Sequence, residues 1–559
     1  MQRIRKYVCF SVLALSTVLF SASAKGFNHG PGPFRKSFHG AKNVIVLIPD
    51  GCNEAVQTAT RWYKGSELNL DRMHTGDVKV HMANSIIPGS AAASTAMATG
   101  HKTTVRFLGV GPRTDDLLTD FVPTADPYAP VASILEAAKL TGRATGLVAT
   151  SRITHATPAG FACHIHDRGL DNEIMEHMVY NNIDVVFGGG ARHLLPSGET
   201  YTTSFGDTWR GYRTDGENLL TVLRNRGYAF VDSKDGMNAV SCGKVWGLFD
   251  DSHMEADIDR AMFYPTQPSL AEMTSKAIEI LSQDPNGFFM MVEGSQVDWA
   301  GHANDPVYMV TDFLAFDDAV GVAYDFAQRD GKTLVIVLPD HNTGGMAIGQ
   351  YRNDDHYTAV SIEELVEPLK KMQVTSTGLA RFFGNYTSED IKSAVATYWG
   401  IELSGEDMDE IMADMPKVGP SYAVAKVVSK NHTIIGWTTH QHNAETVPLW
   451  AYGPGKPSGL IDNTEIAGYA ARAMGVSLDF MTDFLFVDVA EVTGNYTIDN
   501  DDPKNPVLKI NSADIPISKD YMNVFGHKVK LPGVTVYAPI TGKVYVSKKA
   551  LRMAGIRVR

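Results

Sequence analysis

Six continuous apolar runs recur along the chain, and they constrain its fold more than any other feature. They lie at 44–48, 146–149, 183–187, 288–292, 334–338 and 447–452. Runs without polar alternation are typical of strands that are buried on both faces of a parallel sheet. Helical patterns lie between several of them, at 130–140, 270–281 and 310–328. The alternation predicts an α/β fold with a doubly wound, mostly parallel sheet flanked by helices.

The first 24 residues have the pattern of a secretion signal. Arg3, Arg5 and Lys6 form a basic start, an apolar stretch follows at 8–20, and small residues occupy 22–24. We therefore expect residues 1–24 to be removed and the mature chain to be exported to the periplasm or the extracellular space. The apolar stretch is too short for a comfortable membrane span, and no second stretch approaches that length, so no span is expected in the mature chain.

The rest of the chain predicts a core in two parts with an insertion and an extension. The core is expected at 25–343 and 432–483, a helical insertion at 344–431, and a small β-rich C-terminal module at 484–559. Three helix-start patterns mark the insertion, namely Ser361-x-x-Glu364, Thr387-x-x-Asp390 and Ser404-x-x-Asp407. In the extension, strand-like segments at 534–537 and 543–546 flank a turn at 539–542, which predicts a hairpin.

Charge and cysteine content exclude several kinds of function. The net charge of −13 at pH 7 makes nucleic-acid binding a poor interpretation, and an anionic substrate would need concentrated positive charge, which metal ions could supply. After the predicted signal, cysteines remain only at Cys52, Cys163 and Cys242, with no CxxC pair. Neither a disulfide-built scaffold nor a thiolate zinc site is therefore predicted.

Four short segments, far apart in the sequence, end in side chains that bind metal ions. They carry Asp50; Glu293, Asp298 and His302; Asp340 and His341; and His440 and His442. Three of the carboxylates follow or end predicted strands, and ligands of open α/β sheets bind at that edge, so we expect these carboxylates to converge. Asp298 and His302 are four residues apart and would share a helix face. By composition alone, His440 and His442 are equally plausible ligands.

A fifth segment offers a nucleophile. Ser90 follows the turn dipeptide 88–89 and precedes a run of Ala, Ser and Thr that Gly100 closes. A helix starting here would present free N–H groups and a positive dipole end to an anion at Ser90. The structural alternative is a serine that caps the helix, which this segment favours when taken alone. Together with several divalent ions, a nucleophile at this position indicates metal-assisted hydrolysis.

These motifs resemble those of alkaline phosphatases, in the family's order, over most of 42–345 and again at 432–480. The family's nucleophile motif is matched at 90–92, 95–96 and 99–100, its Thr-Pro-Ala segment at 157–159, and its phosphate-binding arginine by Arg168. Its Glu-Gly-x-x-x-Asp-x-x-x-His and Asp-His motifs are matched by the carboxylates and histidines at 293–302 and 340–341. Matching the downstream segments 447–449 and 452–454 selects His442 over His440.

The resemblance implies hydrolysis of phosphate monoesters through a phosphoserine at Ser90, with Arg168 gripping the phosphoryl oxygens. It implies two Zn²⁺ and one Mg²⁺. One zinc would be held by Asp298, His302 and His442, and the second by Asp50, Asp340 and His341. Magnesium would lie near Asp50, Thr157 and Glu293, beside His155. Histidine and carboxylate ligands suit zinc, and carboxylate and hydroxyl ligands suit magnesium.

The chain departs from the family pattern at three places. Gly89 replaces an aspartate that helps to orient the arginine, so Arg168 is expected to be more mobile and phosphate to be retained more weakly. His155 and Trp299 stand where members vary, which leaves the third metal open between magnesium and zinc. A phosphodiesterase or sulfatase of the same superfamily is the alternative enzyme, and an inert surface protein the alternative of another class. The insertion corresponds to the family's variable crown, and a homodimer is possible because dimers are common in the family.

Overall fold

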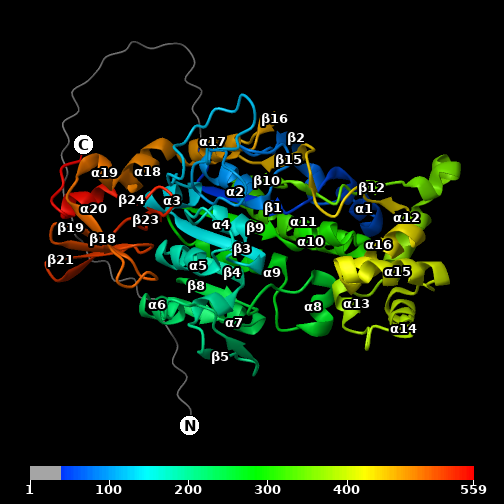
Figure 1. Ribbon diagram of the computed structural model, residues 1–559. Helices are drawn as coiled ribbons and strands as arrows, with labels where there is room; N and C mark the ends of the chain where they lie inside the picture. Colours follow the sequence, from blue (N-terminus) through cyan, green and yellow to red (C-terminus); the bar gives the residue numbers. More distant parts are fainter. Residues whose placement is uncertain (1–39, 559) are drawn as a thin grey trace, which may run out of the picture. The chain divides into compact units, whose positions relative to one another are not determined.

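A ten-stranded sheet forms the centre of the computed structural model, which describes residues 40–558 (Figure 1). The predicted signal at 1–24 lies outside the described residues. The strand order is β16 (Gly459–Asp462), β2 (His74–Lys79), β15 (Val447–Tyr452), β10 (Thr333–Val337), β1 (Asn43–Pro49), β9 (Phe288–Gly294), β3 (Ala144–Arg152), β4 (Val185–Gly189), β8 (Val245–Leu248) and β7 (Ala229–Val231).

The sheet confirms the predicted fold class. All neighbouring strands pair in parallel except at β15, which runs antiparallel to both β10 and β2. Each of the six apolar runs lies largely or wholly within one strand of this sheet. The strands at its centre are buried on both faces, which explains why their sequences do not alternate between polar and apolar residues.

Helices cover both faces of the sheet and enclose two separate cores. Alternate residues of β1 point to opposite sides, with Ile45 and Leu47 in one core and Val44, Val46 and Ile48 in the other. The first core is covered by α1 (Glu54–Lys64), α9 (Leu270–Leu281), α10 (Gln296–Ala303) and α11 (Pro306–Asp330). The second is covered by α2 (Ser90–Thr99), α3 (Ile134–Leu140), α4 (Ala156–Gly160), α5 (Asp171–Tyr180) and α17 (Thr464–Met474). This arrangement is the doubly wound form.

The helical part of the predicted insertion begins later than expected. It consists of α12 (Ile362–Lys371), α13 (Ser376–Ala380), α14 (Ser388–Trp399), α15 (Gly405–Val418) and α16 (Pro420–His432), drawn mainly in yellow in Figure 1. All three predicted capping boxes are present. The preceding residues instead form the short strands β11 (Asn342–Thr343) and β12 (Ala347–Ile348) and a 3₁₀ segment, η3 (Tyr351–Ala359). Gly344 and Gly345 have positive φ there, which breaks a helix.

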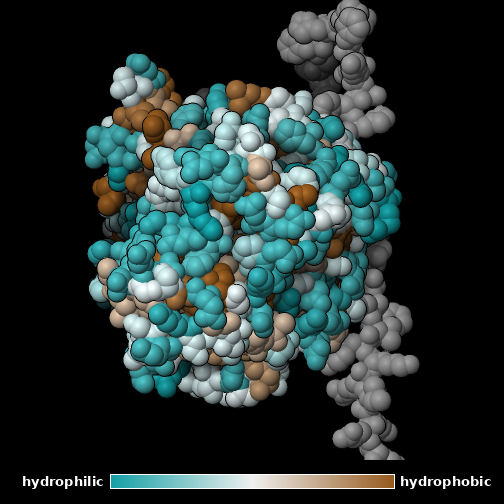
Figure 2. Space-filling view, turned by 90° about the vertical axis from the view of Figure 1, so that its right-hand side faces the viewer, coloured by the Kyte–Doolittle hydropathy of each residue, from teal (hydrophilic) through white to brown (hydrophobic). Residues whose placement is uncertain are grey.

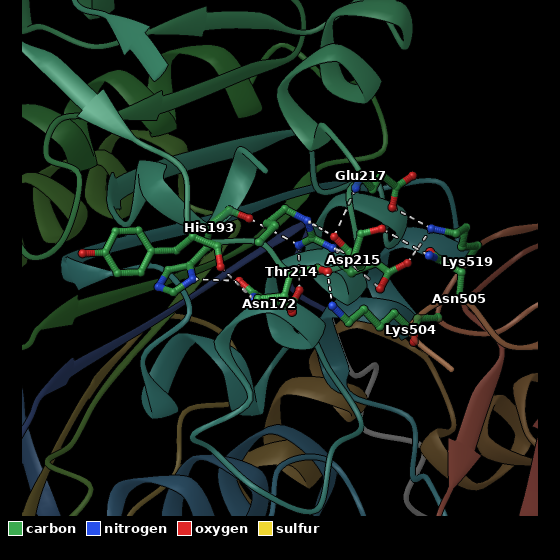
Figure 3. A network of polar contacts seen from close by, with 12 residues as sticks. Asn172, His193, Thr214, Asp215, Glu217, Lys504, Asn505 and Lys519 are labelled. Carbon is green, nitrogen blue, oxygen red and sulfur yellow. Dashed lines mark hydrogen bonds and ion pairs between the residues drawn. The ribbon is translucent and has the colours of Figure 1, made fainter. Parts of the chain in front are cut away.

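The C-terminal residues form two small antiparallel sheets. The meander packs around a third core, whereas Val536, Ala538 and Tyr545 of the other sheet pack into the second core of the main body. The predicted hairpin is present as β23 (Val536–Ala538) and β24 (Lys543–Val546), which pair with β17 (Val487–Asp488). Five further strands follow one another in a meander: β18 (Tyr496–Asp499), β19 (Val507–Ile510), β20 (Ala513–Pro516), β21 (Tyr521–Val524) and β22 (His527–Lys530). Lys519 ties this module to the main body through Glu176, at 2.5 Å, and Glu217, at 2.6 Å (Figure 3).

The surface that carries the insertion is mostly hydrophilic, with small separate apolar patches (Figure 2). Across residues 40–558, no helix combines the length and the apolar character that crossing a membrane requires.

Candidate active site

Three buried carboxylates lie at the C-terminal edge of the sheet, where the sequence predicted that they would meet. Asp50 follows β1, Glu293 lies near the end of β9, and Asp340 follows β10. The register pairs Ile48 of β1 with Glu293, and β10 is the other neighbour of β1. All three carboxylates are completely buried. Asp50 and Asp340 are almost three hundred positions apart in the sequence, and the parallel strands bring them together.

Asp298, His302 and His442 form one group of converging ligand atoms, all within 4.8 Å of one another. Asp298 and His302 share a face of α10, with His302 Nε2 3.4 Å from Asp298 Oδ2. The other ring nitrogens donate to main-chain carbonyls, His302 Nδ1 to His440 at 2.6 Å and His442 Nδ1 to Pro88 at 2.8 Å. These bonds fix both tautomers so that Nε2 carries the free lone pair, the usual arrangement of a metal-binding histidine.

His341 lies at the centre of a second group. Its Nε2 is 3.1 Å from Asp340 Oδ2 and 3.4 Å from Asp50 Oδ1. The ligand atoms of Asp50, Asp298 and His341 lie within 4.8 Å of one another, so Asp298 stands between the first group and this one. Two cation positions next to each other are compatible with this arrangement of atoms.

Ser90 is the first residue of α2 and is buried. Gly89, in extended conformation, is the N-cap residue, and no side chain caps the helix, so the reading of Ser90 as the N-cap is wrong. The Ser90 Oγ atom lies 3.2 Å from His341 Nε2. The serine hydroxyl thus sits at the open, positively polarised end of a helix and against the ligand atoms of the second group.

A third group surrounds the other side of Asp50. Asp50, His155 and Glu293 offer ligand atoms within 4.8 Å of one another, and Thr157 Oγ1 donates to Asp50 Oδ2 at 3.2 Å. The Arg168 guanidinium donates to His155 Nε2 at 2.9 Å. The eleven residues that the family resemblance assigns to the site therefore all lie in or beside one place in the structure.

The buried carboxylates of the site lack compensating positive charge from the protein. Asp50 Oδ1, Glu293 Oε1 and Asp340 Oδ2 accept no hydrogen bond from any described residue. Burial raises the pKa of Glu293 and of Asp340 to about 7 each. Burial, together with the charges of its carboxylate neighbours, also raises the pKa of Asp50. Such groups are costly in a folded protein unless cations bind them, so the donor set fits the implied divalent ions.

Several residues that support the site gave no signal in the sequence. Thr343 Oγ1 donates to Asp298 Oδ1 at 2.5 Å, and Ser151 Oγ donates to Glu293 Oε2 at 3.3 Å. His253 packs edge-to-face on Trp299, 4.5 Å between ring centroids, beside His155. A single hydroxyl or imidazole outside any motif cannot be recognised as supporting a ligand until the fold brings the two together.

A fourth acidic group resembles a metal site by distance but is already neutralised. Glu176, Asp215 and Glu217 lie close together beneath the C-terminal module. Lys519 bonds to both glutamates and Arg213 to Asp215 (Figure 3). The protein's own cations thus occupy this position, and the group ties the module to the main body.

Known proteins resemble this chain over most of its length. The family model described as alkaline phosphatase matches residues 41–476. Alkaline phosphatase 3 of Bacillus subtilis is 34% identical over 490 residues, which cover 83% of this chain and 96% of that protein. The repressible alkaline phosphatase of Saccharomyces cerevisiae is 28% identical over 500 residues, covering 81% of this chain and 84% of that protein.

Solved structures agree with this relationship. The alkaline phosphatase of Thermus thermophilus superposes with a TM-score of 0.67 at 26% identity, covering 78% of this chain and 92% of that one. A variant of the alkaline phosphatase from the Antarctic bacterium TAB5, with Mg bound in its M3 site, has a TM-score of 0.55 at 27% identity and covers 79% of this chain and all of that one. This chain belongs to the alkaline phosphatase family, whose members are metal-dependent phosphomonoester hydrolases.

Proposed function

We propose that this protein hydrolyses phosphate monoesters through a phosphoserine formed at Ser90, with two Zn²⁺ and one Mg²⁺ bound. The observation that carries the proposal is the position of Ser90 Oγ, at the start of α2 and 3.2 Å from His341 Nε2, near three buried carboxylates that each have one oxygen without a hydrogen-bond partner. A nucleophile in this setting has an anion-binding helix end on one side and cation ligands on the other.

Each of the three groups of side chains offers ligands for one of the three proposed ions. Asp298, His302 and His442 suit one zinc, and Asp50, Asp340 and His341 suit the second. The hydroxyl and carboxylate oxygens of Thr157, Asp50 and Glu293 suit magnesium, and His155 beside them leaves zinc as the alternative in this position. Bound there, the ions would supply positive charge for the phosphoryl group and would lower the pKa of oxygen atoms that bind them.

The proposed reaction has two displacement steps, in which Ser90 is first the nucleophile and then the leaving group. Ser90 Oγ attacks phosphorus as its proton is lost, and the bond from phosphorus to the leaving oxygen breaks, after which that oxygen takes up a proton. Water then attacks the phosphoserine, the bond from phosphorus to Oγ breaks, and Ser90 regains a proton as phosphate departs. The guanidinium of Arg168 can hold two phosphoryl oxygens through both steps.

The replacement of the family aspartate by Gly89 removes one partner of that guanidinium. In this structure Arg168 is held by neutral His155 instead, at 2.9 Å, and burial lowers the pKa of His155. A neutral partner orients the guanidinium less strongly than a carboxylate would. We therefore expect weaker retention of phosphate, and an inhibition constant of inorganic phosphate in the low micromolar range would argue against this reasoning.

The first test is hydrolysis of p-nitrophenyl phosphate against pH, before and after chelation, with zinc and magnesium restored separately. We expect activity at neutral to alkaline pH that chelation removes and only both ions restore. Ser90→Ala should abolish turnover while metal binding is kept, whereas Ser94→Ala, one turn further along α2, should keep turnover. Mass spectrometry after an acid quench should find phosphate on Ser90. Activity on a diester or a sulfate ester, but not on the monoester, would contradict the proposal.

We further propose the division into a core at 25–343 and 432–483, an insertion at 344–431 and an extension at 484–559. A third core formed within the extension, around the five-stranded meander, supports the last boundary. Limited proteolysis should release the extension as a stable fragment if this boundary is right, and cleavage only inside the small sheets would contradict it. Export of the chain and a homodimer stay predictions.

A further inference from the structure

A large cavity lies between the C-terminal module and the main body. Its volume is about 950 Å³, at the upper end of the range of roughly 300–1,000 Å³ that is typical of ligand-binding pockets. The main body lines it with residues from 164–177 and 214–217, and the module with residues from 500–507, 516–521 and 536–539. Part of this lining is exposed, so the cavity is open to solvent. Pockets for organic ligands often lie where two parts of a chain meet in this way.

The charged side chains of the lining are largely paired within the protein. Three of the four lining carboxylates bond to a cation: Glu176 and Glu217 to Lys519, and Asp215 to Arg213 (Figure 3). The other lining lysine, Lys504, donates from Nζ to the Thr214 carbonyl at 2.6 Å, and Glu173 is without an ion pair among the described residues. The cavity therefore offers no free cation to hold a phosphate ester, which argues against a second substrate site.

The rest of the lining combines flat apolar rings with polar groups that have no partner. It includes four prolines and three tyrosines, namely Tyr128, Tyr521 and Tyr537. No residue within 40–558 hydrogen-bonds to the three phenol hydroxyls or to the side chains of His166 and Asn500. Hydroxyl, imidazole and amide groups can each donate or accept a hydrogen bond without carrying charge. Such a lining matches a sugar, whose ring has C–H groups on its faces and hydroxyls around its edge.

Two residues of the lining have a strained backbone. Tyr128, from the main body, has φ of +60°, and Ser518, from the module, has φ of +64°. The left-handed conformation is unfavourable for side chains other than glycine, and strained residues of this kind cluster at binding sites. Ser518 Oγ also bonds to Nε2 of buried His177, at 3.1 Å. The surrounding structure thus holds both walls in place before a ligand arrives, which lowers the cost of ordering them on binding.

We propose that this cavity binds a neutral oligosaccharide, whose rings pack on the tyrosines and whose hydroxyls bond to the polar groups that have no partner. Its volume leaves room for more than one sugar ring. The site binds and does not catalyse, so it would hold the protein on a polysaccharide. This inference goes beyond the proposed function and does not depend on it, because none of the eleven residues assigned to the active site lines the cavity.

The test is isothermal titration calorimetry of the full chain with cellohexaose, maltohexaose, laminarihexaose and xylohexaose. We expect at least one of these probes to bind with a dissociation constant below about 1 mM. Tyr537→Ala should weaken that binding about tenfold or more, whereas Tyr537→Phe, which keeps the ring, should weaken it roughly fivefold or less. Phe525→Ala is the matched control and should bind as the wild type does, because Phe525 is a 79% exposed aromatic residue of the same module that does not line the cavity.

Three results would overturn the proposal. They are no binding of any of the four probes by the wild type, binding that Tyr537→Ala leaves unchanged, and tighter binding of a galacturonate hexamer or of spermidine than of every neutral probe. If Tyr537→Ala does not fold, Asn500→Ala decides, because Asn500 is exposed and its loss should weaken binding roughly fivefold. Turnover of p-nitrophenyl phosphate by the folded variants should stay within about twofold of the wild type. Its absence in the wild type would refute the proposed function without bearing on saccharide binding.

Discussion

Substitution of Gly51 tests whether the turn after β1 controls the position of Asp298. Gly51 has φ of +72°, and a Cβ atom placed on it would lie 2.6 Å from Thr343 Oγ1, 2.8 Å from Asp298 Cα and 2.9 Å from Asp298 Oδ1. Gly65, at the end of α1, has φ of +73° with nothing within 4 Å of such a Cβ. The two glycines therefore share a backbone strain and differ only in their surroundings.

The structure sets the size of the expected difference. The left-handed conformation costs an alanine roughly 1–2 kcal/mol at either position. Overpacking adds about 1–3 kcal/mol at Gly51 alone, because contacts below 3 Å must open by roughly 0.6–1 Å before ordinary van der Waals distances return. Asp298 and Thr343 belong to the site, so a displacement of about 1 Å should lower kcat/KM of Gly51→Ala on the order of 100-fold.

The assay is chemical denaturation together with kcat/KM for p-nitrophenyl phosphate in excess zinc and magnesium. Gly65→Ala should lose about 1–2 kcal/mol of unfolding free energy and keep kcat/KM within about twofold. Gly51→Ala should lose more stability and most of its activity. Equal losses of stability in the two variants, with activity of Gly51→Ala within about threefold of the wild type, would refute the reasoning.

Three further predictions concern stability. Burial raises the pKa of Asp259 to about 6, so the native state holds a proton that the unfolded chain loses near pH 4. This contribution to the free energy of unfolding is therefore lost as pH rises from about 4 to 6. Denaturation curves measured across this range should show a loss of about 2–3 kcal/mol from this group, and Asp259→Asn should remove it. Lys519→Met should cost about 3–5 kcal/mol, because buried Glu176 would lose its nearest cation and keep only Arg213, at 3.9 Å. Lys530→Met, at a 67% exposed side chain, should cost less than about 1 kcal/mol, and similar losses in the two variants would contradict the pairing. Zinc added to the chelated protein at 100 times its dissociation constant should raise the unfolding free energy by about 2.7 kcal/mol per site, and an unchanged melting temperature would count against metal binding to the folded state.

The fold class was predictable because the central strands are buried on both faces, which leaves long apolar runs in the sequence. The other strands gave no such signal. β2 contains Gly76 and a polar sequence, HTGDVK, whose burial follows no alternation, and β7 is only three residues long. Their place in the sheet depends on neighbours such as β15 that are distant in sequence, and these pairings cannot be read from local propensity.

The candidate site was predictable to the extent that chemistry is concentrated in motifs. Asp298 and His302 share a helix face, and Asp340 and His341 follow a buried strand, so spacing alone drew attention to both pairs. Thr343 could not be found in this way, because a threonine outside any motif has no property that distinguishes it from an ordinary packing residue. Only the fold shows that its hydroxyl donates to Asp298 Oδ1.

The base of the proposed insertion explains how a long segment can lie between two groups of candidate metal ligands without displacing them. β11 pairs antiparallel with β14 (His442–Asn443), so that Thr343 lies opposite His442, and β12 pairs with β13 (Ile435–Gly436) one step further out. These two ladders fix both ends of the insertion, and the entropy of closing a loop grows only slowly with its length. The insertion can therefore change in length and sequence while His442 keeps its position.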